Sequence, residues 1–140
     1  MFISYSHKDK VWLERLETVL KPLVRSGALV PWSDTRIQPG DQWREEIENA
    51  VARAKVAVLL VSADFLASDF IAEKELPPLL AAAEQEGVKI LWVYLRPCLY
   101  KVTPIAEYQA AHDVAKPLAG LKDWEGVLVE IAEKIHQAAG

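Results

Sequence analysis

A short stretch that follows an apolar run carries the side chains of this chain best suited to chemistry. The stretch SADFLASDFIAEKEL occupies residues 62–76 and combines serines, aromatic rings and two glutamates. The apolar run before it, VAVLLV at 56–61, is typical of a strand that is covered on both faces in a parallel sheet. Ligands bind beyond the carboxyl ends of such strands, so residues 62–76 are where we expect a site.

Glu73 and Glu75 are the carboxylates nearest the end of this stretch, and a helix would not direct both to the same side. Residues two apart on a helix point about 200° away from each other, so one of the two would face a cleft. The apolar stripe that begins at Phe70 and Ile71 continues to Lys74 or Glu75 and then to Leu76. This pattern favours Glu75 as the inward-facing acid and leaves Glu73 on the flank. The alternative is that both glutamates belong to a solvated helix face.

The elements that must position these side chains follow an alternating pattern. Strand and helix periods alternate five times, which is typical of a wound α/β sheet. We expect a flavodoxin-like three-layer sandwich with a five-stranded parallel sheet in the order 2-1-3-4-5 and helices on both faces. The expected strands are 2–5, 28–34, 56–61, 88–95 and 114–118.

Helices are expected between these strands. Apolar residues recur at helical spacing over 12–23, 43–54 and 124–135, with Gly27 as a stop signal after the first and Asp123 as a cap before the last. Within 64–87, Pro77 and Pro78 interrupt the pattern, because an interior proline costs about 3 kcal/mol in a helix. We expect a short helix near 69–75, a kink in which Leu76 leaves helical angles, and a second piece with proline in its first turn.

In the order 2-1-3-4-5, the winding direction reverses between the first and third strands. A crevice there would be walled by residues 5–7 and 62–70. Asp34, Arg36 and Trp43 follow the second strand and would form a rim or lid. The alternative is that Asp34 is a turn residue and Trp43 is a core anchor.

Composition excludes several classes of protein. The chain has 140 residues, 16 basic and 20 acidic, which gives a net charge of -4 and argues against nucleic-acid binding. Its apolar runs are too short for a membrane span, and we expect one soluble cytoplasmic domain, 1–140, excised from a longer protein. Cys98 is the single cysteine, and the three histidines, His7, His112 and His136, lack ligand spacing with it. We therefore expect no metal and a structural thiol.

Four segments together carry a resemblance to a known family. They are FISYSHKD at 2–9, WSDTRIQPGDQW at 32–43, VLLVSADFLASDFIAEKEL at 58–76 and LRPC at 95–98. These resemble, in order, the first box, the loop after the second strand, the acidic helix and the end of the fourth strand of a bacterial Toll/interleukin-1 receptor (TIR) domain. The likeness spans essentially the whole chain.

The resemblance implies an activity. Many TIR domains of bacteria and plants cleave the nicotinamide bond of NAD, so it implies an NAD glycohydrolase or cyclase in bacterial immune or antiphage signalling. The family's catalytic glutamate commonly lies six residues after a serine. In this chain Ser68 to Glu75 is seven steps and Ser68 to Glu73 is five, while Glu75-Leu76 matches the usual Glu-Leu ending. Glu75 is therefore the first candidate for the catalytic acid and Glu73 the second.

The resemblance also implies roles for neighbouring residues and for partners. NAD would be the substrate, with no further cofactor, and other TIR domains and a fused sensor domain would be partners. Assembly would join copies through the loop that contains Arg36, Ile37, Pro39 and Gly40. The substrate contacts expected are Tyr5, Ser6, Asp34, Arg36, Trp43, Ser62, Phe65, Ser68 and Phe70. The alternative function is a non-enzymatic adaptor that acts through homotypic contacts.

Tyr5, Phe65 or Phe70 would stack on nicotinamide or adenine, and Ser6 or Ser62 would donate to phosphate or ribose. Arg36 would contact the pyrophosphate.

Overall fold

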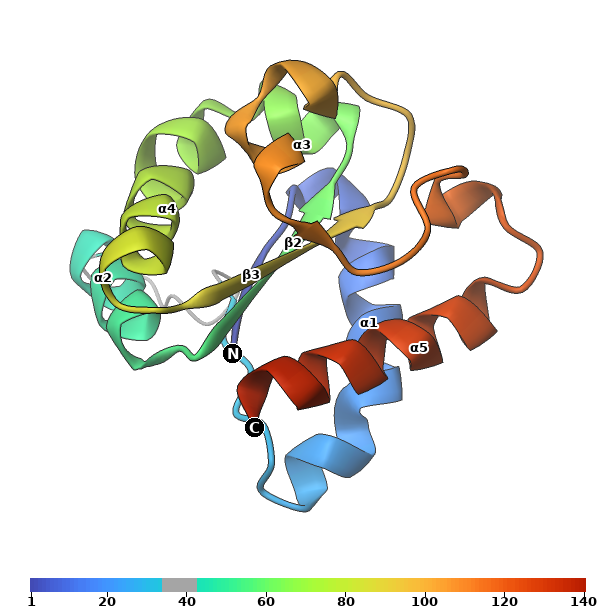
Figure 1. The fold of residues 1–140 in the computed structure, drawn as a ribbon, viewed down its shortest axis with the longest axis horizontal. Helices are drawn as coiled ribbons and strands as arrows, with labels where there is room; N and C mark the ends of the chain where they lie inside the picture. The colour runs from blue at the N-terminus through green and yellow to red at the C-terminus, as the bar shows by residue number, and fades with distance from the viewer. Residues whose placement is uncertain (34–42) are drawn as a thin grey trace.

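A parallel β-sheet forms the centre of the protein in a computed structural model that describes residues 1–33 and 43–140 (Figure 1). Four strands pair in the order β1-β2-β3-β4. They are β1 (Phe2–Ser4), β2 (Val56–Val61), β3 (Lys89–Tyr94) and β4 (Gln109–Ala110). The parallel α/β class expected from the sequence is confirmed, with four strands among the described residues instead of five.

The second strand, expected over 28–34, is reduced to an isolated parallel bridge between Trp32 and Phe2. The Ile3 N–H donates to the Trp32 carbonyl at 2.8 Å, and the Trp32 N–H donates to the Met1 carbonyl at 2.8 Å. Pro31 has no N–H to donate, which keeps the pairing short at this edge. The bridge lies beside β1 on the side away from β2, so the order of the elements agrees with the expected one.

The last strand was expected in the wrong place. It is β4, Gln109–Ala110, paired with Leu91 and Trp92 of β3, whereas residues 114–117 form no strand and Leu118 begins a short 3-10 helix, η6 (Leu118–Gly120). The Ala111 N–H extends the pairing by donating to the Trp92 carbonyl at 2.8 Å. Ala110 and Ala111 have low strand propensity, and this explains why the sequence did not predict a strand here.

Helices cover both faces of the sheet and make the three expected layers (Figure 1). One face packs against α1 (Lys10–Arg25) and α5 (Trp124–Ala139). The other packs against α2 (Trp43–Arg53), α3 (Ala63–Ala67), the π-helical turn η3 (Ile71–Glu75) and α4 (Leu76–Gln85). No helix among the described residues is long and apolar enough to cross a membrane.

Two signals expected at helix ends are present. Gly27 follows α1 with φ +81°, the left-handed conformation in which glycine is favoured. Asp123 precedes α5, and its Oδ1 accepts from the Gly126 N–H at 3.2 Å. The end of α1 and the start of α5 therefore carry the signals that the sequence predicted.

The helical segment before Pro77 and Pro78 is wound differently from the expectation. Leu76 keeps helical angles, with φ -62° and ψ -48°, so the predicted departure of Leu76 from the helix is wrong. Its N–H donates to the Ile71 carbonyl, five residues earlier, which defines a π turn instead of an α turn. The two prolines then fall in the first turn of α4, as expected, where the absence of their N–H groups is tolerated.

Candidate functional site

Glu75 points into the molecule from the last position of η3. Its side chain is 1% exposed, and the Ser4 Oγ of β1 donates a hydrogen bond to Glu75 Oε1 at 2.6 Å. Side chains alternate along β1, so Phe2 and Ser4 face the α2 and α4 layer, while Ile3 and Tyr5 face α1 and α5. The carboxyl group therefore lies among apolar side chains at the carboxyl end of β1.

The π turn explains the unusual spacing before Glu75. Ile71 and Glu75 are both buried, whereas Ala72 and Glu73 between them are exposed. A π turn takes one more residue than an α turn, so it offsets the one-residue excess in the step from Ser68 to Glu75. The Ser68 Oγ accepts from the Ile71 N–H at 3.2 Å and holds the start of the turn.

Glu73 lies on the opposite side of the turn from Glu75. It lines an open cavity of about 190 Å³ between α2 and the start of α4; the other lining residues are Arg44, Ile47, Glu48, Lys74 and Pro78. The expectation that only one of the two glutamates faces inward is confirmed, and Glu75 is that one. Glu73 is the carboxylate of the two that solvent reaches.

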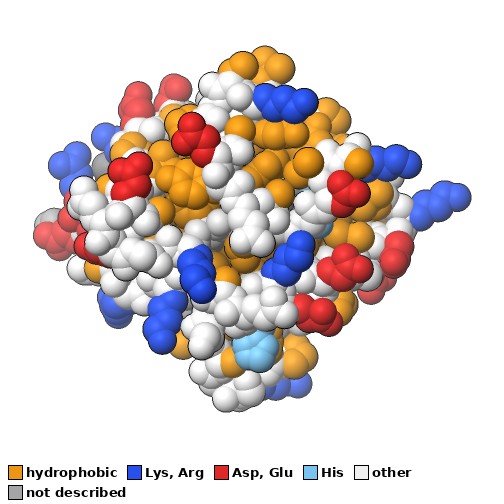
Figure 2. All heavy atoms as spheres, viewed as in Figure 1, with side chains coloured by type: hydrophobic (Ala, Val, Ile, Leu, Met, Phe, Trp, Pro, Cys, Tyr) orange, Lys and Arg blue, Asp and Glu red, His pale blue; other side chains and the backbone are white. Residues whose placement is uncertain are grey.

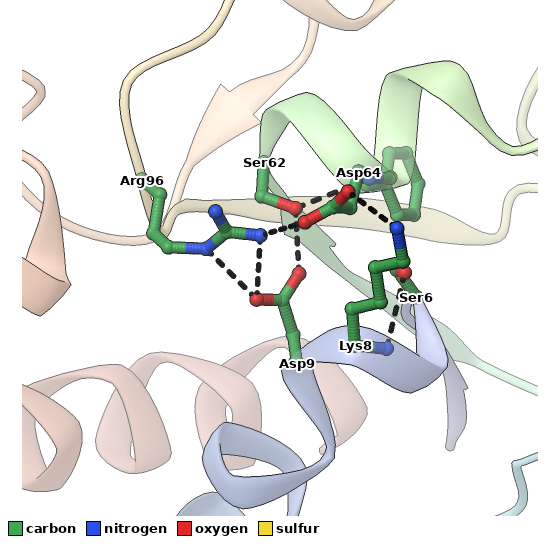
Figure 3. A network of polar contacts seen from close by, with 7 residues as sticks. Ser6, Lys8, Asp9, Ser62, Asp64 and Arg96 are labelled. Atoms are coloured by element: carbon green, nitrogen blue, oxygen red, sulfur yellow. Dashed lines mark hydrogen bonds and ion pairs between the residues drawn. The ribbon is translucent and has the colours of Figure 1, made fainter.

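A second polar cluster joins the carboxyl ends of β1, β2 and β3 (Figure 3). Ser62 Oγ donates to Asp9 Oδ2 at 2.6 Å, and Arg96 Nε donates to Asp9 Oδ1 at 2.9 Å. Arg96 Nη2 also donates to Asp64 Oδ2 at 2.6 Å, and Lys8 Nζ lies 3.6 Å from Asp64 Oδ1. One guanidinium thus bridges two carboxylates, that of Asp9 at the end of the 3-10 helix η1 (His7–Asp9) and that of Asp64 in the first turn of α3.

Electrostatics in this cluster favour the charged forms of Asp64 and Arg96. The hydrogen bond from Arg96 holds the pKa of Asp64 below its usual value, and the attraction of Lys8 adds to this effect. The hydrogen bonds to Asp9 and then Asp64 raise the pKa of Arg96. The cluster therefore links η1, α3 and the segment after β3, and its two carboxylates share the cation of Arg96.

The other expected contacts at the strand ends are mostly engaged within the protein. Tyr5 and Phe65 are 1% exposed, so neither ring presents a face to a ligand in this structure. Ser6 Oγ accepts from the Lys8 N–H at 3.3 Å, and Ser62 Oγ accepts from the Phe65 N–H at 3.1 Å. Phe70 is the one of the three aromatic candidates that reaches the surface.

Several expected contacts belong to the segment that follows Ser33. Asp34, Arg36, Ile37, Pro39 and Gly40 lie outside the described residues. Trp43 begins α2, and its side chain also lies outside the described part. The roles expected for these residues remain predictions.

The sequence reasoning missed Asp9, Asp64 and Arg96. Each lies within a few residues of the carboxyl end of a parallel strand, and a survey of charged residues at those ends would have found them. The sequence did not show that the guanidinium of Arg96, which follows β3, contacts the carboxylates of Asp9 and Asp64, which follow β1 and β2.

The single cysteine and the buried histidine make none of the hydrogen bonds that define the two clusters. Cys98 is half-buried, and burial raises the pKa of its thiol, which makes it a poorer nucleophile. Burial lowers the pKa of His112. Among residues 1–33 and 43–140, no three His, Cys, Asp or Glu side chains are grouped so that they could hold a metal ion.

Comparisons with known proteins agree with this fold. The family described as TIR domain matches residues 1–123, so the chain belongs to the TIR domain family. The chain is 29% identical over 140 residues to an uncharacterized protein, y4lF, of Sinorhizobium fredii, and it spans 43% of the length of that protein.

A solved structure supports the same conclusion about the fold. The TIR domain of the Toll-related receptor TRR-2 of Hydra magnipapillata superposes with a TM-score of 0.58 at 24% identity. The alignment covers 78% of this chain and 81% of that one.

Proposed function

We propose that this TIR domain is an NAD glycohydrolase in which Glu75 is the catalytic carboxylate. The observation that carries the proposal is the direction of Glu75, which turns inward at the carboxyl end of β1 and accepts a 2.6 Å hydrogen bond from Ser4. Ligands of open parallel sheets bind beyond this edge. Glu73 is the second candidate, because it lies on the same turn and lines an open cavity.

One carboxylate is sufficient for this reaction. The nicotinamide of NAD is cationic while bound to ribose and leaves as a neutral base, so it needs no proton from an acid, unlike the oxygen leaving groups of most glycosidases. Positive charge develops on the ribose as the bond breaks. A carboxylate beside the ribose stabilises that charge, and the stabilisation grows when water is excluded.

The site in this single copy is closed, so we propose that assembly with other copies opens it. Glu75 is 1% exposed, and a ribose cannot reach the carboxyl group until the residues that cover it move. Apolar side chains gather on the upper part of one face, over α3 and the segment after β3 (Figure 2). Leu99 and Val102 in that segment are 76% and 82% exposed, which favours contact with a protein surface.

An adaptor that acts through homotypic contacts is the second candidate. The burial of Glu75 favours it, because a carboxyl group that never reaches solvent would have a structural role. An adaptor would not depend on the charge of Glu75. It would depend on the loop that contains Arg36, Pro39 and Gly40, and changes there would remove signalling with Glu75 dispensable.

Nicotinamide release from NAD distinguishes the two functions. The purified domain, concentrated or crowded, is incubated with NAD, and the products are separated by chromatography. Release by the native chain that is lost in Glu75→Gln and Glu75→Ala, and retained in Glu73→Gln, supports catalysis by Glu75. Loss in Glu73→Gln alone transfers the role to Glu73. No release from the native chain under assembly conditions, monitored by light scattering, leaves the adaptor.

A further inference from the structure

We propose that Ser4 is a positioning residue for the carboxylate of Glu75, an inference that rests on the proposed function. Ser4 lies at the end of β1 and is 0% exposed. Its hydroxyl donates to Glu75 Oε1 at 2.6 Å across 71 residues of sequence. This is the short distance expected when a hydroxyl donates to an ionised carboxylate.

The surroundings of Ser4 explain why a hydroxyl at this position would serve Glu75. Ser4 pairs with Leu59 of β2, and its face of the sheet carries Phe2, Leu59 and Val61, all of them apolar and fully buried. A hydroxyl group buried in such a layer is costly unless it makes a hydrogen bond. The bond to Glu75 satisfies the hydroxyl, and the hydroxyl gives the carboxylate a donor within an apolar layer.

The backbone on each side of the bond fixes its geometry. Ser4 belongs to a strand that is paired on one side with β2 and beside the Trp32 bridge on the other. Glu75 closes the π turn, and a turn with a different number of residues would rotate its side chain away from β1. A rigid strand therefore holds one oxygen of a carboxylate that the helix directs toward it.

This arrangement has two consequences for the proposed reaction. A donated hydrogen bond favours the charged form of a carboxylate, which is the form that stabilises positive charge on ribose. It also restricts rotation of the carboxyl group, so that its position relative to a ribose is set before substrate arrives. Ser4 would not contact the substrate and would act through Glu75.

The test compares Ser4→Ala, which removes the hydroxyl, with Ser4→Thr, which keeps it. We expect nicotinamide release by Ser4→Ala to fall about 10-fold to 100-fold in kcat with little change in KM. The acid limb of its pH profile should move up by about one pH unit, because the charged carboxylate has lost a donor. Ser4→Thr should recover most of the rate and the native profile.

A matched control separates positioning from loss of stability. Ile135→Val removes a methylene from the core on the other face of the sheet, where Ile135 is 0% exposed, and should destabilise the fold to a similar extent. We expect its pH profile to match that of the native chain. A Ser4→Ala profile that also matches the native one, with an active native chain, would overturn the role of Ser4 and leave the proposed function intact.

A spectroscopic measurement tests the bond without turnover. The Glu75 carboxyl carbon, identified in NMR spectra by its absence from Glu75→Gln, is titrated in the native chain and in Ser4→Ala. We expect a higher titration midpoint in Ser4→Ala, and equal midpoints would contradict the proposal. A native chain that releases no nicotinamide would overturn the proposed function, and the role of Ser4 in catalysis with it.

Discussion

Two buried carboxylates at the same edge of the sheet are held in different ways. Glu75 and Asp9 each accept a 2.6 Å hydrogen bond from a serine at the end of a strand, Ser4 in one case and Ser62 in the other. Asp9 is also bound by the guanidinium of Arg96, which bridges to Asp64. Glu75 sits at the end of a π turn against the apolar face of the sheet.

The difference separates a structural carboxylate from a candidate catalyst. The charge of Asp9 is already balanced by Arg96, so it can add little to the stabilisation of a developing cation. Its network joins three strand ends and resists their separation. The comparison teaches that burial and a serine donor do not identify a catalytic acid, and that the element that carries the acid must also be considered.

Exchange of each carboxylate for its amide should give the largest contrast. We expect Glu75→Gln to lower nicotinamide release by at least about 1000-fold, because the amide cannot stabilise positive charge on ribose. Asp9→Asn should retain release within about threefold for each folded molecule. The two rates, normalised to the folded fraction measured by circular dichroism, check this. Equal losses in both variants would remove the distinction.

Removal of the bridging cation should destabilise the Asp9 cluster. We expect Arg96→Met to lower the free energy of unfolding by about 2 kcal/mol, because it leaves buried Asp9 without its cation, with the value reduced for the partial exposure of Arg96. Lys8→Met is the matched control. Its side chain is 78% exposed, and the loss should stay below about 0.5 kcal/mol.

Urea unfolding of both variants measures the difference. If Arg96→Met lowers the free energy of unfolding no more than Lys8→Met does, Arg96 does not stabilise the cluster.

The two serines should differ in their contribution to stability. Ser62 donates to Asp9 and also accepts from the Phe65 N–H at the start of α3, whereas Ser4 makes the bond to Glu75. We expect Ser62→Ala to cost about 2 kcal/mol and Ser4→Ala about 1 kcal/mol, since the first removes a helix cap as well as a donor. Thermal unfolding of both variants gives the order, and the reverse order would contradict it.

The smallest expected effect is on the stability of the protein at acidic pH, to which Asp64 contributes. The pKa of Asp64 is lowered in the folded protein by its hydrogen bond with Arg96, so the unfolded chain binds more protons near the ordinary value of 3.8. The resulting stability is present above pH 3.8 and is lost as the pH falls through the lower folded pKa. We expect Asp64→Asn to flatten the dependence of the urea midpoint on pH below about pH 4. An unchanged slope would contradict this role.

The sequence was sufficient for the layers and for the direction of Glu75, because periodicity reports which face of an element is buried. It was not sufficient for the Asp9 cluster, since Arg96 and Asp9 are 87 residues apart and no local pattern links them. It also could not show that Tyr5 and Phe65 are buried in this structure, and their expected contacts with a ligand stay predictions. An aromatic residue at a strand end has the same local pattern in either location.

The π turn before Pro77 shows a different limit. The prolines predicted a break at Leu76, and the chain instead kept helical angles by widening one turn. A widened turn depends on which side chains it brings to the sheet, here Ile71 and Glu75, and that information is tertiary.

The most direct measurement is a structure of the assembled protein with NAD or a non-hydrolysable analogue bound. We expect the nicotinamide ribose to lie at the carboxyl end of β1, with its hydroxyls within about 3.2 Å of the Glu75 carboxylate, while Ser4 keeps its bond to the other side of that group. A ribose bound beside Glu73, or elsewhere, with Glu75 still sealed against Ser4, would contradict catalysis by Glu75.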